Sequence, residues 1–310
     1  MNNNEQPAWD GRTYYGETQL RAAPFNNSLV GSYIFLAGLS GAAQLLATLM
    51  DLAGGRTAEP AIRRGRYLAM LAPTLGSLCL ILDLHTPQRF YNMLRLIKTT
   101  SPMSLGSWAL VGFGITGAVT AASQWVADRL GCSWLRRAAR VVQVPAALAG
   151  GFMGTYTASL LSATSTPSWA AAPRSLATRY ASSAVASAAA AMGLGERDAR
   201  RRRDLDSIAL AALAVEIAAT LSSEDVQRRA GIDDEPDAQK TPGAIVPLVL
   251  LGSSLLLPGR LGRAASVAGA LATLGGALAM RIRVLQRGAQ SARQPRHSLR
   301  FAQPDNLPRR

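Results

Sequence analysis

The sequence predicts an all-α, polytopic membrane protein with about eight transmembrane helices, and three observations lead to this fold class. Of the 310 residues 48% are apolar, although the formal charge is +14. The apolar residues gather in runs of roughly 18 or more with few charges, the length needed to cross a bilayer. The arginines separate these runs and do not gather beside aromatic residues, which argues against nucleic-acid binding and against a soluble enzyme.

Eight apolar runs are expected to cross the membrane: residues 28–52, 67–84, 103–127, 138–161, 176–195, 205–222, 243–258 and 262–281. The fifth run is rich in Ala and Ser, so we expect it to pack between other helices. Pro258 and Gly259 predict a tight turn before the last run. The expected organisation is therefore a polar N-terminal segment (1–27), a transmembrane domain (28–282) and a basic C-terminal tail (283–310).

The loop charges predict an orientation. With eight spans, both termini lie on one side, face A, together with the loops near 85–102, 162–175 and 223–242. Face B carries the loops near 53–66, 128–137, 196–204 and 259–261. Face B and its helix ends hold 15 Lys and Arg, against 10 on face A without the C-terminal tail. The positive-inside rule then places face B in the cytoplasm and both termini outside it, although the basic tail argues the other way.

Several cofactors are excluded by the scarcity of their ligands. The two cysteines, Cys79 and Cys132, form no CxxC pair, so neither a zinc site nor an iron–sulfur cluster is expected. The two histidines, His85 and His297, are too few and too far from the span centres for haem ligation by a histidine pair. We expect no metal and no haem in this chain.

Face A gathers polar residues from three segments that are distant in sequence. Asn26 and Asn27 precede the first run, Asp83 ends the second, and Tyr156 lies one to two turns before the end of the fourth. His85 and Arg89 follow in the loop after the second run. A quinone needs hydrogen-bond donors at its oxygens, a proton path and apolar walls, and these residues supply them. The alternative is that each is an amphipathic anchor at the lipid headgroups.

Glu216 lies well inside the sixth run, where an ionisable group is costly and requires a partner. We consider two roles for it, a proton relay together with Asp83 or a paired carboxyl that holds helices together. Gln44, Gln124 and Gln143 are expected to form hydrogen bonds between helices.

The loop after the second run also carries a family resemblance. The segment LDLHTPQRFYNMLRLIKTTSPMSLGSWAL is similar to the signature of the NrfD/PsrC family, the polysulfide-reductase-type membrane subunits. Three further stretches resemble it: YYG at 14–16, YTASLLSATSTPSW at 156–169, and KTPG followed by two hydrophobic runs. His85 and Thr86 stand where the family usually has Gly-Arg, so the loop geometry is expected to differ there.

The resemblance implies a haem-free quinone-binding subunit with two four-helix bundles, located in the bacterial inner membrane. The quinone, menaquinone or ubiquinone, would bind near Asn26, Asn27, Asp83, Arg89 and Tyr156. The implied partners are a ferredoxin-like iron–sulfur subunit and, beyond it, a molybdopterin catalytic subunit that carries the main substrate reaction. Among its substrates formate is preferred, without a residue-level argument. The alternatives are a proton- or ion-translocating transporter subunit and a purely structural membrane anchor.

Overall fold

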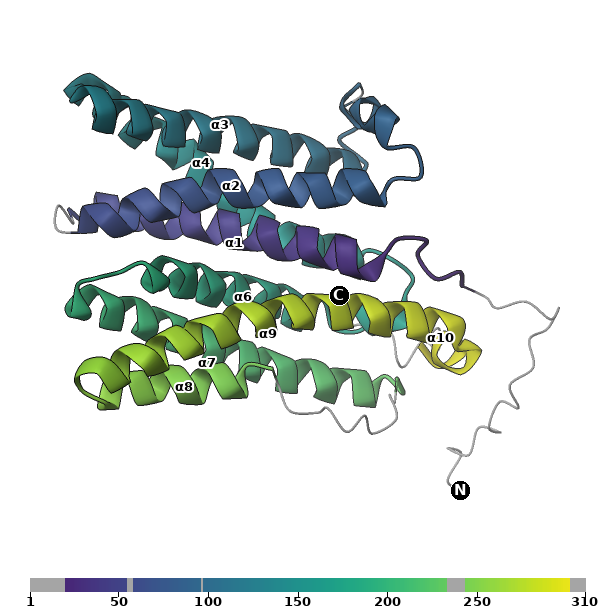
Figure 1. Ribbon diagram of the computed structural model, residues 1–310. Coiled ribbons are helices and arrows are strands. Elements are labelled where there is room, and N and C mark those ends of the chain that lie inside the picture. Colours follow the sequence, from purple (N-terminus) through teal and green to yellow (C-terminus); the bar gives the residue numbers. More distant parts are fainter. Residues whose placement is uncertain (1–19, 55–57, 96, 233–242, 302–310) are drawn as a thin grey trace.

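The computed structural model describes residues 20–54, 58–95, 97–232 and 243–301, and the regular structure in these ranges is entirely helical. Eight longer helices lie side by side, and three short ones lie at the end where α1 begins (Figure 1). The longer helices are α1 (Asn27–Leu52), α2 (Glu59–Asp83), α3 (Pro102–Leu130), α4 (Ser133–Ser162), α6 (Pro173–Leu194), α7 (Ala199–Arg229), α8 (Ile245–Leu256) and α9 (Gly259–Arg293). The short ones are the 3₁₀ helix η2 (Pro87–Leu94), α5 (Pro167–Ala170) and α10 (Pro295–Phe301).

The longer helices form two four-helix bundles, α1–α4 and α6–α9, which lie next to each other in Figure 1. The bundles meet where α1 contacts α6 and α9, and where α4 contacts α6. At this seam the guanidinium of Arg281, on α9, lies 5.8 Å from the ring centroid of Phe35 on α1, and Gly38 leaves room beside it. The fold is therefore an all-α polytopic membrane protein.

Small residues let the helices of the first bundle approach closely. A Cβ atom on Gly41 of α1 would lie 2.2 Å from the carbonyl oxygen of Gly150 on α4. Any side chain at Gly41 would therefore push the two backbones apart. Packing of this kind is how membrane helices associate, because lipid tails are as apolar as the helix surfaces.

Local sequence explains where several helices begin and end. The Asn26 side chain accepts hydrogen bonds from the backbone amides of the first turn of α1, and Ser101 and Asp198 cap α3 and α7 in the same way. Gly131, with φ +69°, ends α3 in the left-handed conformation that glycine adopts most easily. Only Gly131 and Cys132 separate α3 from α4.

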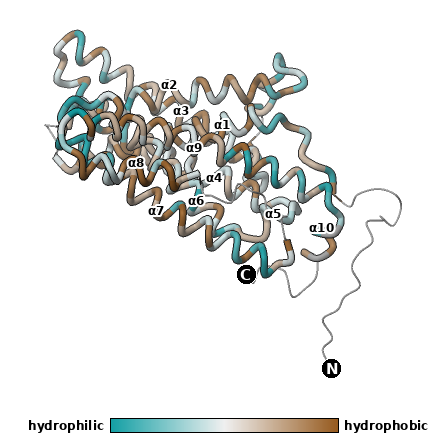
Figure 2. The backbone as a smooth tube through the Cα atoms, turned by 60° about the horizontal axis from the view of Figure 1, so that its bottom comes forward, coloured by the Kyte–Doolittle hydropathy of each residue, from teal (hydrophilic) through white to brown (hydrophobic). Residues whose placement is uncertain are grey.

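Five of the described helices, α1, α2, α3, α7 and α9, are long and apolar enough to cross a membrane by length and composition. Helix α8 is apolar but has 12 residues, while α4 and α6 run alongside the five (Figure 1). Figure 2 shows hydrophilic residues concentrated at the turns and helix ends.

The helices differ from the predicted runs at their polar ends. Helix α2 begins at Glu59, about two turns before the run at 67–84, so Arg66 lies inside a helix and not in the loop predicted for 53–66. Helix α9 passes the domain boundary predicted at residue 282 and continues to Arg293. Hydropathy marks the lipid-facing part of a helix, whereas the helix itself extends for as long as its backbone hydrogen bonds do. Residues 1–19 and 302–310 of the predicted terminal segments lie outside the described residues.

Candidate functional site

The face A rim of the first bundle joins the start of α1 to the end of α2. The backbone amide of Asn26 donates a hydrogen bond to Oδ1 of Asp83, at 2.7 Å. The Asn26 side chain meanwhile accepts from the amides of Ser28 (2.9 Å) and Leu29 (3.2 Å). Asp83 is half-buried, and within the described ranges its Oδ2 has no hydrogen-bond partner. The structure therefore brings together Asn26 and Asp83, two of the predicted site residues.

Tyr156 lies in the same half of the bundle but bonds to a different element. It sits six residues before the end of α4, about 9 Å along the helix, and is buried. Its hydroxyl donates to the carbonyl oxygen of Pro102 at 2.6 Å, and Gly106 leaves room for its ring against α3. In this arrangement Tyr156 holds the start of α3, which follows the rim loop.

The remaining predicted residues stand apart. Asn27 is the first residue of α1 and is half-buried, whereas His85 and Arg89 are exposed in the loop that contains η2. Among the residues that the structure describes, neither the His85 nor the Arg89 side chain makes a polar contact with Asp83 or Tyr156. This loop also carries exposed aromatic rings, Phe90 (42% exposed) and Tyr91 (55%). The rim thus combines the Asp83 carboxyl, which a hydrogen bond holds in place, with an exposed loop that carries both apolar and basic side chains.

Glu216 lies in the second bundle, far from this rim in the sequence and on another helix. It is buried, and its carboxyl interacts with the Ser183 hydroxyl and with the charges of Arg179 and Arg281. The Arg281 guanidinium donates to the Ser183 hydroxyl (3.2 Å) and to the Tyr180 carbonyl oxygen (3.3 Å). Glu216 of α7 therefore lies among polar and charged groups of α6 and α9, and its role as a relay or as a helix-holding carboxyl stays a prediction.

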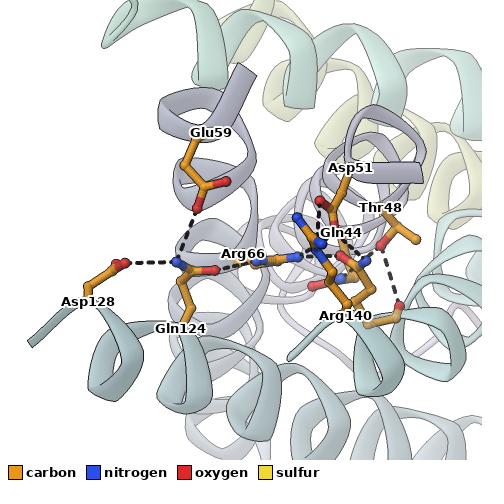
Figure 3. A network of polar contacts seen from close by, with 9 residues as sticks. Gln44, Thr48, Asp51, Glu59, Arg66, Gln124, Asp128 and Arg140 are labelled. Carbon is orange, nitrogen blue, oxygen red and sulfur yellow. Dashed lines mark hydrogen bonds and ion pairs between the residues drawn. The ribbon is translucent and has the colours of Figure 1, made fainter. Parts of the chain in front are cut away.

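A buried polar network, which the sequence did not predict as a unit, fills the face B end of the first bundle (Figure 3). Its centre is Arg66 of α2, 3% exposed. Arg66 donates to Oδ2 of Asp51 on α1 (3.0 Å), to Oε1 of Gln143 on α4 (2.6 Å) and to Oε1 of Gln124 on α3. Gln143 also donates to Asp51 at 2.7 Å. One guanidinium thus links all four helices of the bundle.

The network continues to the surface and into the bundle. Gln124 donates to Asp128 (3.0 Å) and to Glu59 (3.3 Å), and the guanidinium of Arg140, which is exposed, lies 3.4 Å from Asp51. Toward the interior, Gln44 donates to Thr48 at 3.1 Å. The prediction of hydrogen bonds between helices is confirmed for Gln124 and Gln143, whereas the described partner of the Gln44 side chain, Thr48, lies on the same helix, α1. The sequence feature that could have predicted this network is the presence of Asp51 and Arg66, each at the polar end of an apolar run.

The second bundle has its own buried carboxyl near face B. Asp206 of α7 accepts hydrogen bonds from the hydroxyls of Ser254 on α8 and Ser266 on α9, both at 3.0 Å. Asp206 is 3% exposed, and it ties α8 and α9 to α7. In the part of the chain that the structure describes, no group of three or more His, Cys, Asp or Glu residues is placed to hold a metal ion.

The sequence of the chain matches a model of a known protein family. The family model described as polysulphide reductase, NrfD, matches residues 19–222, which include α1 to α6, most of α7 and every residue of the rim. No curated protein matches the chain. The match covers well over half of the 310 residues and confirms the resemblance in the rim loop. The chain is a multi-pass membrane protein that belongs to the polysulphide reductase NrfD family.

Proposed function

We propose that this chain is the quinone-binding membrane subunit of a respiratory oxidoreductase complex. In this proposal it passes electrons between a quinone pool and a ferredoxin-like iron–sulfur subunit, which contacts a molybdopterin catalytic subunit. Family membership supports the role of membrane anchor in such a complex. The observation that supports quinone binding is the hydrogen bond from the Asn26 amide to Asp83, at 2.7 Å. It fixes a half-buried carboxyl where the apolar helices meet the rim loop.

The residues of the rim fit the chemistry of a quinone. Reduction of a quinone to a quinol takes up two electrons and two protons at its two oxygens. Oδ1 of Asp83 is held by Asn26, while Oδ2 is without a partner in the described ranges, so Oδ2 is the oxygen that would hand over or receive a proton. Leu82 (60% exposed), Phe90 and Tyr91 offer apolar surface on the same rim for the ring.

We assign the other predicted residues by their contacts. Asn27, which is half-buried in the first turn of α1, would line the site. The exposed His85 and Arg89 would face it from the aqueous side, although neither makes a polar contact with Asp83 or Tyr156 in the described ranges. Tyr156 positions the start of α3, because its hydroxyl is bonded to Pro102. Glu216 is left out of the proton path, since it lies among the buried groups of the second bundle.

The test of this proposal is an Asp83→Asn substitution in the purified complex with its partner subunits. Asn keeps the acceptor for the Asn26 amide but cannot exchange a proton. We expect normal assembly and a loss of quinone-linked turnover of at least about a hundredfold, the lower end of the range for a lost proton-transfer group. The matched control is Asp225→Asn, a carboxyl on face A that pairs with Arg229 in solvent, which should keep full turnover.

The outcome also separates the quinone site from a purely structural anchor. Steady-state quinol oxidation should fall in the Asp83→Asn complex, while the iron–sulfur clusters, followed by electron paramagnetic resonance, still accept electrons from the catalytic subunit. Unchanged quinol oxidation in a complex of normal composition would support the anchor. Uptake of an ion by proteoliposomes that contain this chain alone would favour the transporter.

We also propose that the chain lies in the bacterial inner membrane with face A outside the cytoplasm. The excess of Lys and Arg on face B supports this orientation. Alkaline phosphatase fused to the N-terminus should then be active and a fluorescent protein fused there should be dark. The opposite pattern would reverse the orientation.

A further inference from the structure

The seam between α2 and α3 carries a cluster of basic and aromatic side chains at face B. Trp125 and Arg129 lie one turn apart near the end of α3, and the Arg129 guanidinium stands over the indole ring, 5.3 Å from its centroid. Trp125 is 53% exposed. On the neighbouring helix, Tyr67 lies near the charges of Asp128, Arg63 and Arg129. Two helices thus contribute to one surface.

The charges of this cluster are only partly paired. Arg63 is paired with Asp128, with Nε and Oδ2 3.0 Å apart. Arg129 has no acidic partner within the described ranges; its contact is the ring of Trp125. The Arg63–Asp128 pair is neutral, so the charge of Arg129 is not compensated by a direct ion pair, although Glu59 of α2 also lies at this seam, where it accepts a hydrogen bond from Gln124. A single monoanionic group would pair with Arg129, and a guanidinium is well suited to bind a phosphate.

An apolar surface begins where the cluster ends. On α2, exposed leucines follow Tyr67 at intervals of three or four residues, so they share one face of the helix: Leu71, Leu75 and Leu78, each 53–56% exposed. On α3, Ile115 (60% exposed) and Val119 (43%) are four residues apart and share one face, and the exposed Trp125 follows six residues later. Both helices are long and apolar enough to span a membrane. Because α2 and α3 are antiparallel neighbours, both surfaces run from face B toward the membrane centre (Figure 1).

We propose that this seam binds an anionic diacyl phospholipid. The phosphodiester lies on the Arg129 guanidinium with the Tyr67 hydroxyl as a second donor. Trp125 lies at the level of the glycerol backbone, as interfacial tryptophans do. The acyl chains follow the exposed apolar residues of α2 and α3. The continuity of the basic cluster with membrane-facing surface favours a lipid over a soluble phosphate or a protein partner.

The experiment measures lipid retention by the full chain in nanodiscs made from equal parts of phosphatidylglycerol and phosphatidylcholine. Native mass spectrometry after detergent extraction counts the lipids that remain bound. We expect phosphatidylglycerol to be retained in preference to phosphatidylcholine, and Arg129→Gln to weaken its retention about fivefold, the effect of one basic residue at an anionic surface. The matched control is Arg203→Gln, an exposed arginine near face B on α7, which should retain phosphatidylglycerol as the unmodified chain does.

Two further measurements keep the proposal testable. Raising the salt concentration should weaken retention of phosphatidylglycerol but not of phosphatidylcholine, and this measurement needs no variant. Soluble glycerol 1-phosphate should fail to displace the lipid, because it lacks acyl chains. Equal retention of the two lipids, an equal loss in both arginine variants, or full displacement by glycerol 1-phosphate would each overturn the proposal.

Discussion

Replacing Arg66 by leucine tests whether the buried network holds the first bundle together. The side chain donates to Asp51, Gln143 and Gln124, which lie on three different helices. Leucine fills part of the same volume but offers no donor. The substitution therefore leaves two glutamine oxygens and a buried carboxyl with fewer partners, at a depth where water is scarce.

The expected loss follows from these contacts. Three hydrogen bonds between membrane helices, at about 0.6 kcal/mol each, set a lower figure of about 2 kcal/mol. Removing one partner of a buried ion pair sets an upper range of about 3–5 kcal/mol. Asp51 keeps its bond from Gln143 at 2.7 Å and its contact with Arg140 at 3.4 Å, which moderates the loss. We expect the free energy of unfolding to fall by about 3 kcal/mol.

The assay is reversible unfolding in mixed detergent micelles, followed by far-ultraviolet circular dichroism. The control is Arg229→Leu, which removes an arginine that is 79% exposed and paired with Asp225 at 2.6 Å; its loss should stay below about 1 kcal/mol. Adding Asp51→Leu to Arg66→Leu should cost less than the sum of the two single changes, because no buried charge is left unpaired; Arg140, which also contacts Asp51, is exposed to solvent. Equal losses for the buried and exposed arginines, or strict additivity, would refute this account of the network.

Two further predictions concern packing and pH. Gly41→Ala should lower the free energy of unfolding by about 1–3 kcal/mol, because its Cβ would meet the α4 backbone, whereas Gly151→Ala, with open space at its Cβ, should change little in the same assay. Burial alone would raise the pKa of Glu196, but the Asp198 backbone amide and the charge of Arg64 hold it below its ordinary value. A depressed carboxyl pKa contributes stability above the unfolded value, about 4.3, and this stability is lost as the pH falls through the folded value. The unfolding midpoint of the unmodified chain should therefore fall more steeply below about pH 4.3 than that of Glu196→Gln, and parallel curves would contradict this.

The membrane helices were largely predictable because hydropathy is a local property. The first run, 28–52, agrees with α1 within one residue at its start, since Asn26 provides a cap just before the apolar stretch. The start of α2 was missed by about two turns, because its first residues are charged and a hydropathy window excludes them. Those charges are tolerated in the helix because each arginine has polar partners: Arg66 donates to Asp51, Gln124 and Gln143, Arg63 pairs with Asp128, and Arg64 pairs with Glu196.

The candidate site was also predictable only in part. The spacing of the runs correctly placed Asn26 and Asp83 at one rim, because both stand at helix ends on face A. It did not foresee that the Tyr156 hydroxyl would bond to Pro102, since this contact depends on how α3 packs against α4. The quinone itself stays a prediction.

The sequence by itself determined that the chain is a bundle of membrane helices with its signature loop at one face. The length of an apolar run and the residues of a loop motif are local features, so they can be recognised without knowing how the helices pack. Only the tertiary structure decided which polar residues are buried together. Arg66 and Arg281 look like ordinary basic residues at the ends of apolar runs, yet both are nearly inaccessible to solvent. Their partners lie on helices up to about a hundred residues away, and only packing brings those helices within hydrogen-bonding distance.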